Sequence, residues 1–109
     1  MNFEIVYSDN FLREIKKLSK KYKSLKNDFT IFLESLENNP LQGDKLGQDC
    51  YKIRMKIASK NKGKSGGARV ITCVKIVNEK IVLLSIYDKK ERDSIEDDEL
   101  NLLLKYAEF

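Results

Sequence analysis

Histidine is missing from the sequence altogether. Its absence removes the most common general base, the usual activator of a nucleophile and the most common metal ligand of proteins. Any chemistry that this chain performs must therefore use lysine, arginine, tyrosine, aspartate or glutamate side chains.

Cysteines are few, and long apolar runs are absent. The two cysteines, Cys50 and Cys73, have neither the dense spacing of a disulfide scaffold nor the paired spacing of a zinc site, so we expect two buried thiols. No run approaches the roughly 18 apolar residues that span a bilayer, and residues 1–5 do not resemble the start of a secretion signal. These absences predict a cytoplasmic protein.

The length and composition fit one folding unit. The chain has 109 residues, of which 41% are hydrophobic, and this proportion supplies enough apolar surface for one core. We therefore expect a single domain over residues 1–109.

Positive charge is concentrated in one segment. The whole chain has a net charge of +4, whereas residues 49–69 carry seven basic side chains against Asp49 alone, a local charge of +6. A local basic excess of this kind is typical of nucleic-acid binding, because each neutralised phosphate releases counterions.

Hydrophobic spacing predicts a strand and two helices in the first part of the chain. Residues 3–7 alternate with the two-residue period of a strand, and the polar residues 8–10 offer helix N-caps. Apolar residues then recur every three or four positions over 11–22 and over 25–36, which predicts a helical hairpin. Pro40 ends the second helix, because proline cannot continue the helical hydrogen bonds.

The rest of the chain predicts three strands and a final helix. Residues 41–50 form a predicted loop, and 51–57 alternate between apolar and basic side chains, as in a half-buried strand with a positive face. Residues 70–76 and 81–87 predict an antiparallel hairpin in the centre of the sheet. Helical spacing returns over 95–107.

The predicted order is strand, helix, helix, three strands and helix, which is an α+β fold with a small antiparallel sheet. The helical hairpin can cover one face of this sheet. The basic side chains of residues 51–57 would then lie on the opposite, open face.

A phosphate-loop pattern occurs over residues 58–65, with alanine in place of the usual first glycine. Such a loop must open a helix whose N-terminal amides hold the phosphates, whereas residues 66–71 lead into a β-branched strand. We therefore do not expect nucleotide hydrolysis.

Two interpretations of the basic strand are open at this point. Exposed lysine and arginine are ordinary on half-buried strands, so the strand could present a solvated face. Basic residues this close together repel one another, however, and a polyanion relieves that repulsion, which favours RNA or DNA binding. The acidic run from Glu91 to Glu99 is interpreted as the solvated start of the last helix, with Asp93 or Ser94 as its cap, and not as a catalytic pair of carboxylates.

Three segments resemble toxins of the RelE/ParE superfamily from type II toxin-antitoxin systems. They are DCYKIRM at residues 49–55, KNKGKSGGARVI at 60–71 and LSIYDKKE at 84–91. The resemblance extends over nearly the whole chain and is strongest for the HigB-like and RelE-like branch. It implies a small ribonuclease-type fold, cleavage of messenger RNA in the ribosomal A site, and neutralisation by a cognate antitoxin, often one with a helix-turn-helix DNA-binding part.

The resemblance also assigns roles to individual residues. The family's basic residues match Lys52 and Arg54 on one strand, Arg69 on the next, and Lys90 after the last strand. Tyr87 could replace the tyrosine that some members have at the position of Glu96, or it could simply cap the core. Further RNA contacts are expected from other lysines, namely Lys56, Lys60, Lys62, Lys64 and Lys89.

The reaction that the resemblance implies uses the 2′-hydroxyl of the messenger to attack the adjacent phosphorus, with no metal and no cofactor. Arg69 and Lys90 would stabilise the charge that develops on the phosphate. Lys52 could act as the general base if the like charges of Arg54 and Lys56 favour its neutral form.

Two other functions remain compatible with the sequence. A ParE-type gyrase poison shares the fold but generally lacks the basic cleavage residues, so Lys52, Arg54 and Arg69 argue against it. A catalytically inactive module that binds RNA or the antitoxin would explain the missing tyrosine. The partners expected for the ribonuclease are messenger RNA, the ribosome and an antitoxin, without a membrane.

Overall fold

The computed structural model of the protein describes residues 3–61 and 63–107. The predicted α+β order is confirmed, with one strand more than expected. In chain order the elements are β1 (Glu4–Tyr7), α1 (Asp9–Lys21), α2 (Leu25–Asn38), β2 (Asp44–Gly47), β3 (Cys50–Met55), the short 3-10 helices η1 (Ala58–Lys60) and η2 (Lys64–Gly66), β4 (Ala68–Lys75), β5 (Lys80–Asp88) and α3 (Asp97–Ala107).

The five strands form one sheet in the order β1-β5-β4-β3-β2. The hairpin of β4 and β5 lies in its centre, as predicted, and the strands from β5 to β2 pair antiparallel. β1 differs, because it joins the edge of the sheet parallel to β5. The sheet is therefore mostly, not wholly, antiparallel.

The additional strand, β2, lies within the predicted loop 41–50. A two-residue turn joins it to β3, and both turn residues, Gln48 and Asp49, have positive φ angles of 54° and 63°. Positive φ at both central positions is the turn geometry that matches the twist of a β-hairpin. The hydrophobic pattern missed β2 because the strand is short and mostly exposed.

The helical hairpin covers one face of the sheet, as predicted. α1 begins at an N-cap, Ser8, whose side-chain oxygen accepts a hydrogen bond from the backbone N–H of Phe11 at 3.1 Å. The core between hairpin and sheet includes residues of both helices and of β3, β4 and β5, namely Phe11, Leu25, Phe32, Leu36, Ile53, Val70 and Leu83. Ile53 and Met55 of β3 face this core, and because side chains alternate along a strand, the residues between them project from the other face.

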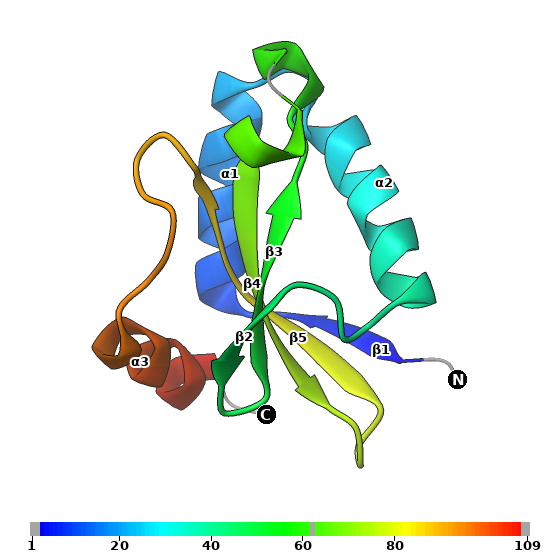
Figure 1. The fold of residues 1–109 in the computed structure, drawn as a ribbon, viewed down its shortest axis with the longest axis vertical. Coiled ribbons are helices and arrows are strands. Elements are labelled where there is room, and N and C mark those ends of the chain that lie inside the picture. The colour runs from blue at the N-terminus through cyan, green and yellow to red at the C-terminus, as the bar shows by residue number, and fades with distance from the viewer. Residues whose placement is uncertain (1–2, 62, 108–109) are drawn as a thin grey trace.

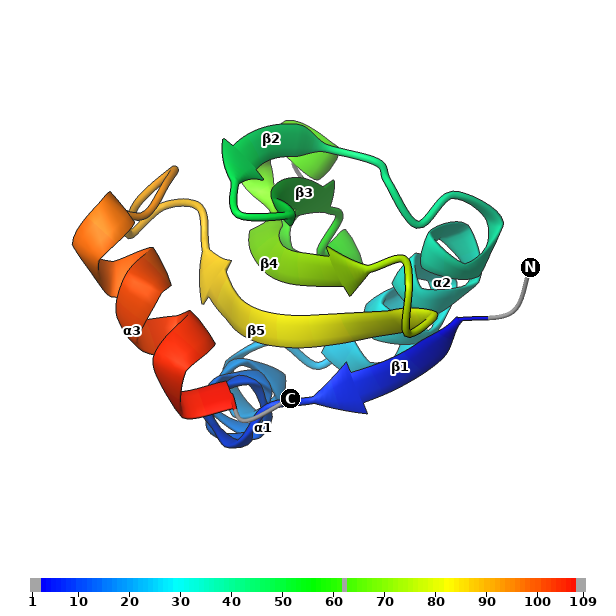
Figure 2. The same ribbon diagram turned by 90° about the horizontal axis from the view of Figure 1, so that it is seen from below.

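The opposite face is only partly open. α3 packs there, and Figure 2 shows α2 and α3 on opposite sides of the sheet. A second core forms under α3 from Leu100 and from strand residues that include Cys50, Cys73, Ile71 and Leu84. Both cysteines are thus buried thiols, as predicted. The part of the face that α3 leaves uncovered contains the basic residues of β3.

Candidate active site

The register of the sheet places three of the predicted site residues in one row. Arg54 on β3 is opposite Arg69 on β4, and Arg69 is opposite Tyr87 on β5. Residues directly opposed in antiparallel strands project from the same face. Lys52 precedes Arg54 by two residues and shares that face. All the predicted catalytic residues except Lys90 therefore converge on the face that α3 partly covers.

Arg69 lies at the centre of this row, and its side chain is only 2% exposed. Its guanidinium donates to the backbone oxygens of Ala68 at 3.1 Å and of Ser65 at 3.0 Å, and its Nε donates to Asp93 Oδ1 at 3.1 Å. These contacts hold the planar donor group in one orientation. A guanidinium held in this way is preorganised to bind an anion.

Asp93 supplies the anion that Arg69 contacts. It lies in the connection between β5 and α3, which Figure 1 shows as a wide loop beside the sheet. Its carboxylate is 3.1 Å from Nη2 of Arg69 and 3.6 Å from Nζ of Lys52, yet its side chain is 60% exposed. Partial burial tends to raise the pKa of Asp93, but the charges of Lys52 and Arg69 outweigh that effect and lower it. The carboxylate is therefore ionised at neutral pH.

The position of Lys52 affects the role predicted for it. Its side chain is 13% exposed and its ammonium faces the carboxylate of Asp93. The ammonium forms an ion pair with that carboxylate, and an ammonium nitrogen has no lone pair to accept a proton. The geometry therefore fits Lys52 as a cation or proton donor better than as the general base.

Tyr87 is buried beside the same loop. Its hydroxyl donates to the backbone oxygen of Asp93 at 3.3 Å, and the guanidinium of Arg92 lies 4.4 Å from the centre of its ring. Burial raises the pKa of Tyr87 to about 12. With a side chain only 5% exposed, Tyr87 is placed to cap the core and to hold the loop, and its ring has little surface for a base to stack on.

A second polar cluster surrounds Asp88 at the end of β5. Its carboxylate is buried and accepts hydrogen bonds from the hydroxyl of Tyr22, from Nζ of Lys60 at 2.7 Å and from the backbone N–H of Lys90 at 3.1 Å. Burial alone would raise the pKa of Asp88, but the hydrogen bonds from Lys60 and Tyr22 lower it to about 2. This cluster ties the end of α1 and η1 to the start of the loop that carries Asp93.

The lysines predicted to contact RNA fall into different environments. Lys60 points inward to Asp88, and its side chain is 9% exposed. Lys56 and Lys89 are exposed, and so is Lys90, which was predicted to stabilise the charge on the phosphate. The ammonium of Lys21 lies close to Lys90 and lowers the pKa of Lys90, so this residue belongs to the Asp88 cluster. The predicted RNA contacts of two lysines stay predictions. Lys62 lies outside the described residues, and the structure places only the backbone of Lys64, at the start of η2.

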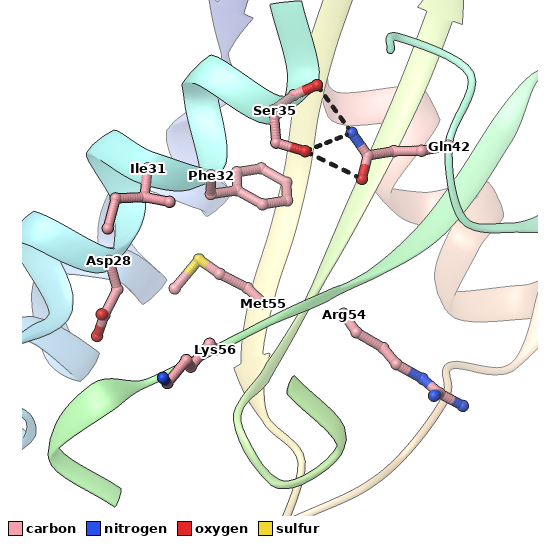
Figure 3. A pocket seen from close by; sticks show the side chains of 8 residues that line it. All are labelled: Asp28, Ile31, Phe32, Ser35, Gln42, Arg54, Met55 and Lys56. Atoms are coloured by element: carbon pink, nitrogen blue, oxygen red, sulfur yellow. Dashed lines mark hydrogen bonds between the residues drawn. The ribbon is translucent and has the colours of Figure 1, made fainter. Parts of the chain in front are cut away.

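A cavity of about 110 Å³ lies between α2 and β3. Figure 3 shows Met55 directed towards Phe32 in this cavity, whereas Arg54 is directed away from both. The amide of Gln42 is already bonded to Ser35. The cavity is therefore a mainly apolar space on the hairpin side of β3. Arg54 contributes to its lining, but the charged end of that side chain is directed away from Phe32 and Met55.

The described residues contain no group of three or more potential metal ligands of the histidine, cysteine or carboxylate type. Within the same part of the chain, no helix is long and apolar enough to cross a membrane.

Sequence reasoning missed Asp88 and Asp93. Asp93 was indistinguishable from its acidic neighbours in the run 91–99, and it does not cap α3, which begins only at Asp97. Asp88 does carry a weak signal, because a carboxylate directly follows an otherwise apolar strand. Such a residue needs a buried partner, but only the fold identifies that partner.

Comparison with known proteins adds to this geometry. A family model described as the RelE toxin of the RelE/RelB toxin-antitoxin system matches residues 10–109. The fold is similar to that of a double mutant of the E. coli toxin RelE in the free state, with a TM-score of 0.61 and 17% identity over 98% of this chain and 95% of that one. It is also similar to a chain of the RelBE2 toxin-antitoxin complex of Mycobacterium tuberculosis, with a TM-score of 0.57 and 12% identity over 81% of this chain and 99% of that one.

Proposed function

We propose that this chain, which belongs to the RelE toxin family and is a toxin of a toxin-antitoxin system, is a metal-independent endoribonuclease that cleaves messenger RNA in the ribosomal A site. The observation that carries this proposal is the row of Arg54, Arg69 and Tyr87, with Lys52 beside it, on one face of the sheet. Three cations on one face, one of them a buried guanidinium, suit a phosphodiester backbone.

The proposed reaction is an attack of the 2′-hydroxyl on the adjacent phosphorus. Lys52 neutralises the charge that develops on the phosphate oxygens, and the buried positive charge of Arg69 beneath the sheet surface adds to the field that stabilises it. Arg54, which is exposed, contacts a neighbouring phosphate and positions the strand. Lys90 and Lys89 contact the RNA further along the chain.

The proposed protein partner is a cognate antitoxin, in which a helix-turn-helix DNA-binding part is expected. Support comes from the family description, which pairs a RelE toxin with RelB, and from the similar chain of Mycobacterium tuberculosis, whose structure is that of a toxin-antitoxin complex.

The test is primer extension on a translated messenger with purified protein, with and without ribosomes. The wild type is compared with Arg69→Lys and with Arg54→Ala, because removal of the buried Arg69 side chain would also disturb folding. We expect cuts within the reading frame that require ribosomes and that weaken in both variants. Intact messenger together with gyrase-dependent DNA breaks would instead identify a gyrase poison, and binding without any cleavage would identify an inactive module.

A further inference from the structure

We infer that Asp93 is the catalytic general base, the group that removes the proton from the attacking 2′-hydroxyl. The inference rests on the proposed ribonuclease function and assigns the proton-transfer residue of the same site. It depends on an observed juxtaposition, since the carboxylate of Asp93 contacts both Arg69 at 3.1 Å and Lys52 at 3.6 Å.

Asp93 meets the requirements for a general base in a protein without histidine. A base must be within hydrogen-bond reach of the proton that it abstracts, and the 2′-hydroxyl is attached to the carbon next to the one that carries the scissile phosphate. A phosphate bound by Lys52, whose ammonium is 3.6 Å from the carboxylate, would therefore bring that hydroxyl next to Asp93. The carboxylate is ionised and 60% exposed, so it can accept a proton and be reached by substrate.

The other candidates on this face are less suitable. Tyr87 is buried with its hydroxyl bonded to the backbone, and its pKa is raised to about 12, so it remains protonated at neutral pH. Lys52 is paired as an ammonium with the carboxylate of Asp93, and an ammonium nitrogen has no lone pair to accept a proton. Asp88 is ionised, but its carboxylate is fully enclosed by Tyr22 and Lys60 and cannot meet the substrate.

The 2′-oxygen forms a bond to phosphorus while its proton passes to a carboxylate oxygen of Asp93. The bond from phosphorus to the 5′-oxygen breaks, and the ammonium of Lys52 gives a proton to that departing oxygen. The products are a 2′,3′-cyclic phosphate and a 5′-hydroxyl, with Asp93 protonated and Lys52 neutral until water exchanges both protons.

An in-line reaction needs the base and the acid on opposite sides of the phosphorus. Asp93 lies in the loop between β5 and α3 whereas Lys52 lies on β3, so the two groups approach a bound phosphate from different elements. The charged groups that face Asp93 are Lys52 from β3, Arg69 from β4 and Lys89 from its own loop, and all three favour the ionised form.

The experiment is single-turnover cleavage on programmed ribosomes by the wild type, Asp93→Asn, Asp93→Glu and Asp93→Ala. Asp97→Asn serves as the matched control, because it removes the same charge from an exposed position at the start of α3. We expect Asp93→Asn to lower the cleavage rate by about 10²- to 10⁴-fold, the usual contribution of a general base. Binding of RNA should be unchanged or tighter, because a negative charge beside the phosphate is lost.

Two further readouts separate proton transfer from a structural role. Asp93→Glu should recover part of the rate, and added formate should partly restore cleavage by Asp93→Ala, which a merely structural carboxylate would not explain. A rate for Asp93→Asn equal to or above that of the wild type would overturn the inference and show that Asp93 only shields Arg69. If the wild type itself leaves the messenger intact, the ribonuclease proposal fails as well, so the two failures are distinguishable.

Discussion

Replacement of Asp88 by asparagine should destabilise the protein more than any exposed substitution. Asp88→Asn removes the charge that faces Lys60, whose side chain is 9% exposed, and so leaves a mostly buried ammonium without its counter-ion. Removing one partner of a buried ion pair typically costs about 3–5 kcal/mol. The hydrogen bond with Tyr22 can persist in the amide, so we expect the lower end, about 3 kcal/mol.

The lowered pKa of Asp88 gives an independent value for the free energy by which its charged contacts stabilise the fold. A change from 3.8 in the unfolded chain to about 2 in the folded protein corresponds to roughly 2.5 kcal/mol. Because the folded pKa is the lower one, this stabilisation is present above the unfolded value. It is lost as the pH falls through the folded value, that is, between about pH 4 and pH 2.

The assay is urea unfolding of the wild type and Asp88→Asn from pH 7 down to pH 2. A loss of about 3 kcal/mol in the free energy of unfolding lowers the urea concentration at the midpoint by roughly 2 M when that free energy falls by about 1.5 kcal/mol per molar urea. The difference between the two proteins should shrink below pH 4, and the control Asp97→Asn should lose no more than about 1 kcal/mol. A loss under about 1 kcal/mol for Asp88→Asn, or a difference that stays constant down to pH 2, would refute the reasoning.

Three other predictions concern stability and RNA binding. Gly67→Ala should cost about 1–3 kcal/mol in thermal unfolding, because a Cβ at Gly67 would stand 2.1 Å from a backbone oxygen of β3; an unchanged melting temperature would contradict this. Lys56→Ala should reduce RNA affinity without loss of stability, and it should lower the slope of log affinity against log salt concentration by about 1. Lys60→Ala should mainly destabilise the fold. The reverse outcome would show that the ammonium of Lys60 is free to bind phosphate. Tyr87→Phe should cost about 0.5–1.5 kcal/mol through its lost hydrogen bond and change the cleavage rate little; a fall as large as that expected for a proton-transfer residue would make its phenol the acid.

Much of the fold follows from local patterns in the sequence. The helical hairpin has apolar residues at helical spacing and a serine cap at Ser8, and the β4–β5 hairpin has two apolar runs joined by a turn. These signals work because burial of one helix face or one sheet face imposes a period on the chain. The pattern did not predict β2, because an exposed edge strand buries too little side-chain surface to impose a period on the sequence. Its pairing with β3 depends on the positive φ angles of Gln48 and Asp49.

By itself, the sequence determined which kinds of chemistry were possible. Without histidine only lysine, arginine, tyrosine and carboxylates are left, and the charge of residues 49–69 points to a polyanion. The alternation of the basic strand was also enough to place Lys52 and Arg54 on one face, because side chains on a strand alternate regardless of context.

Only the tertiary structure decided which charges act together. Arg69 meets Asp93 and Lys60 meets Asp88 across 24 and 28 residues of chain. Nothing local distinguishes Asp93 from its acidic neighbours or Lys60 from the exposed Lys56, and the position of Asp88 at the end of an apolar strand does not identify its partner. The reason is physical: whether a charged side chain remains in water or is buried against a partner depends on the packing of distant strands and loops around it. The local sequence provides the charged groups, and the packing selects Asp93 for the site and Asp88 for the core.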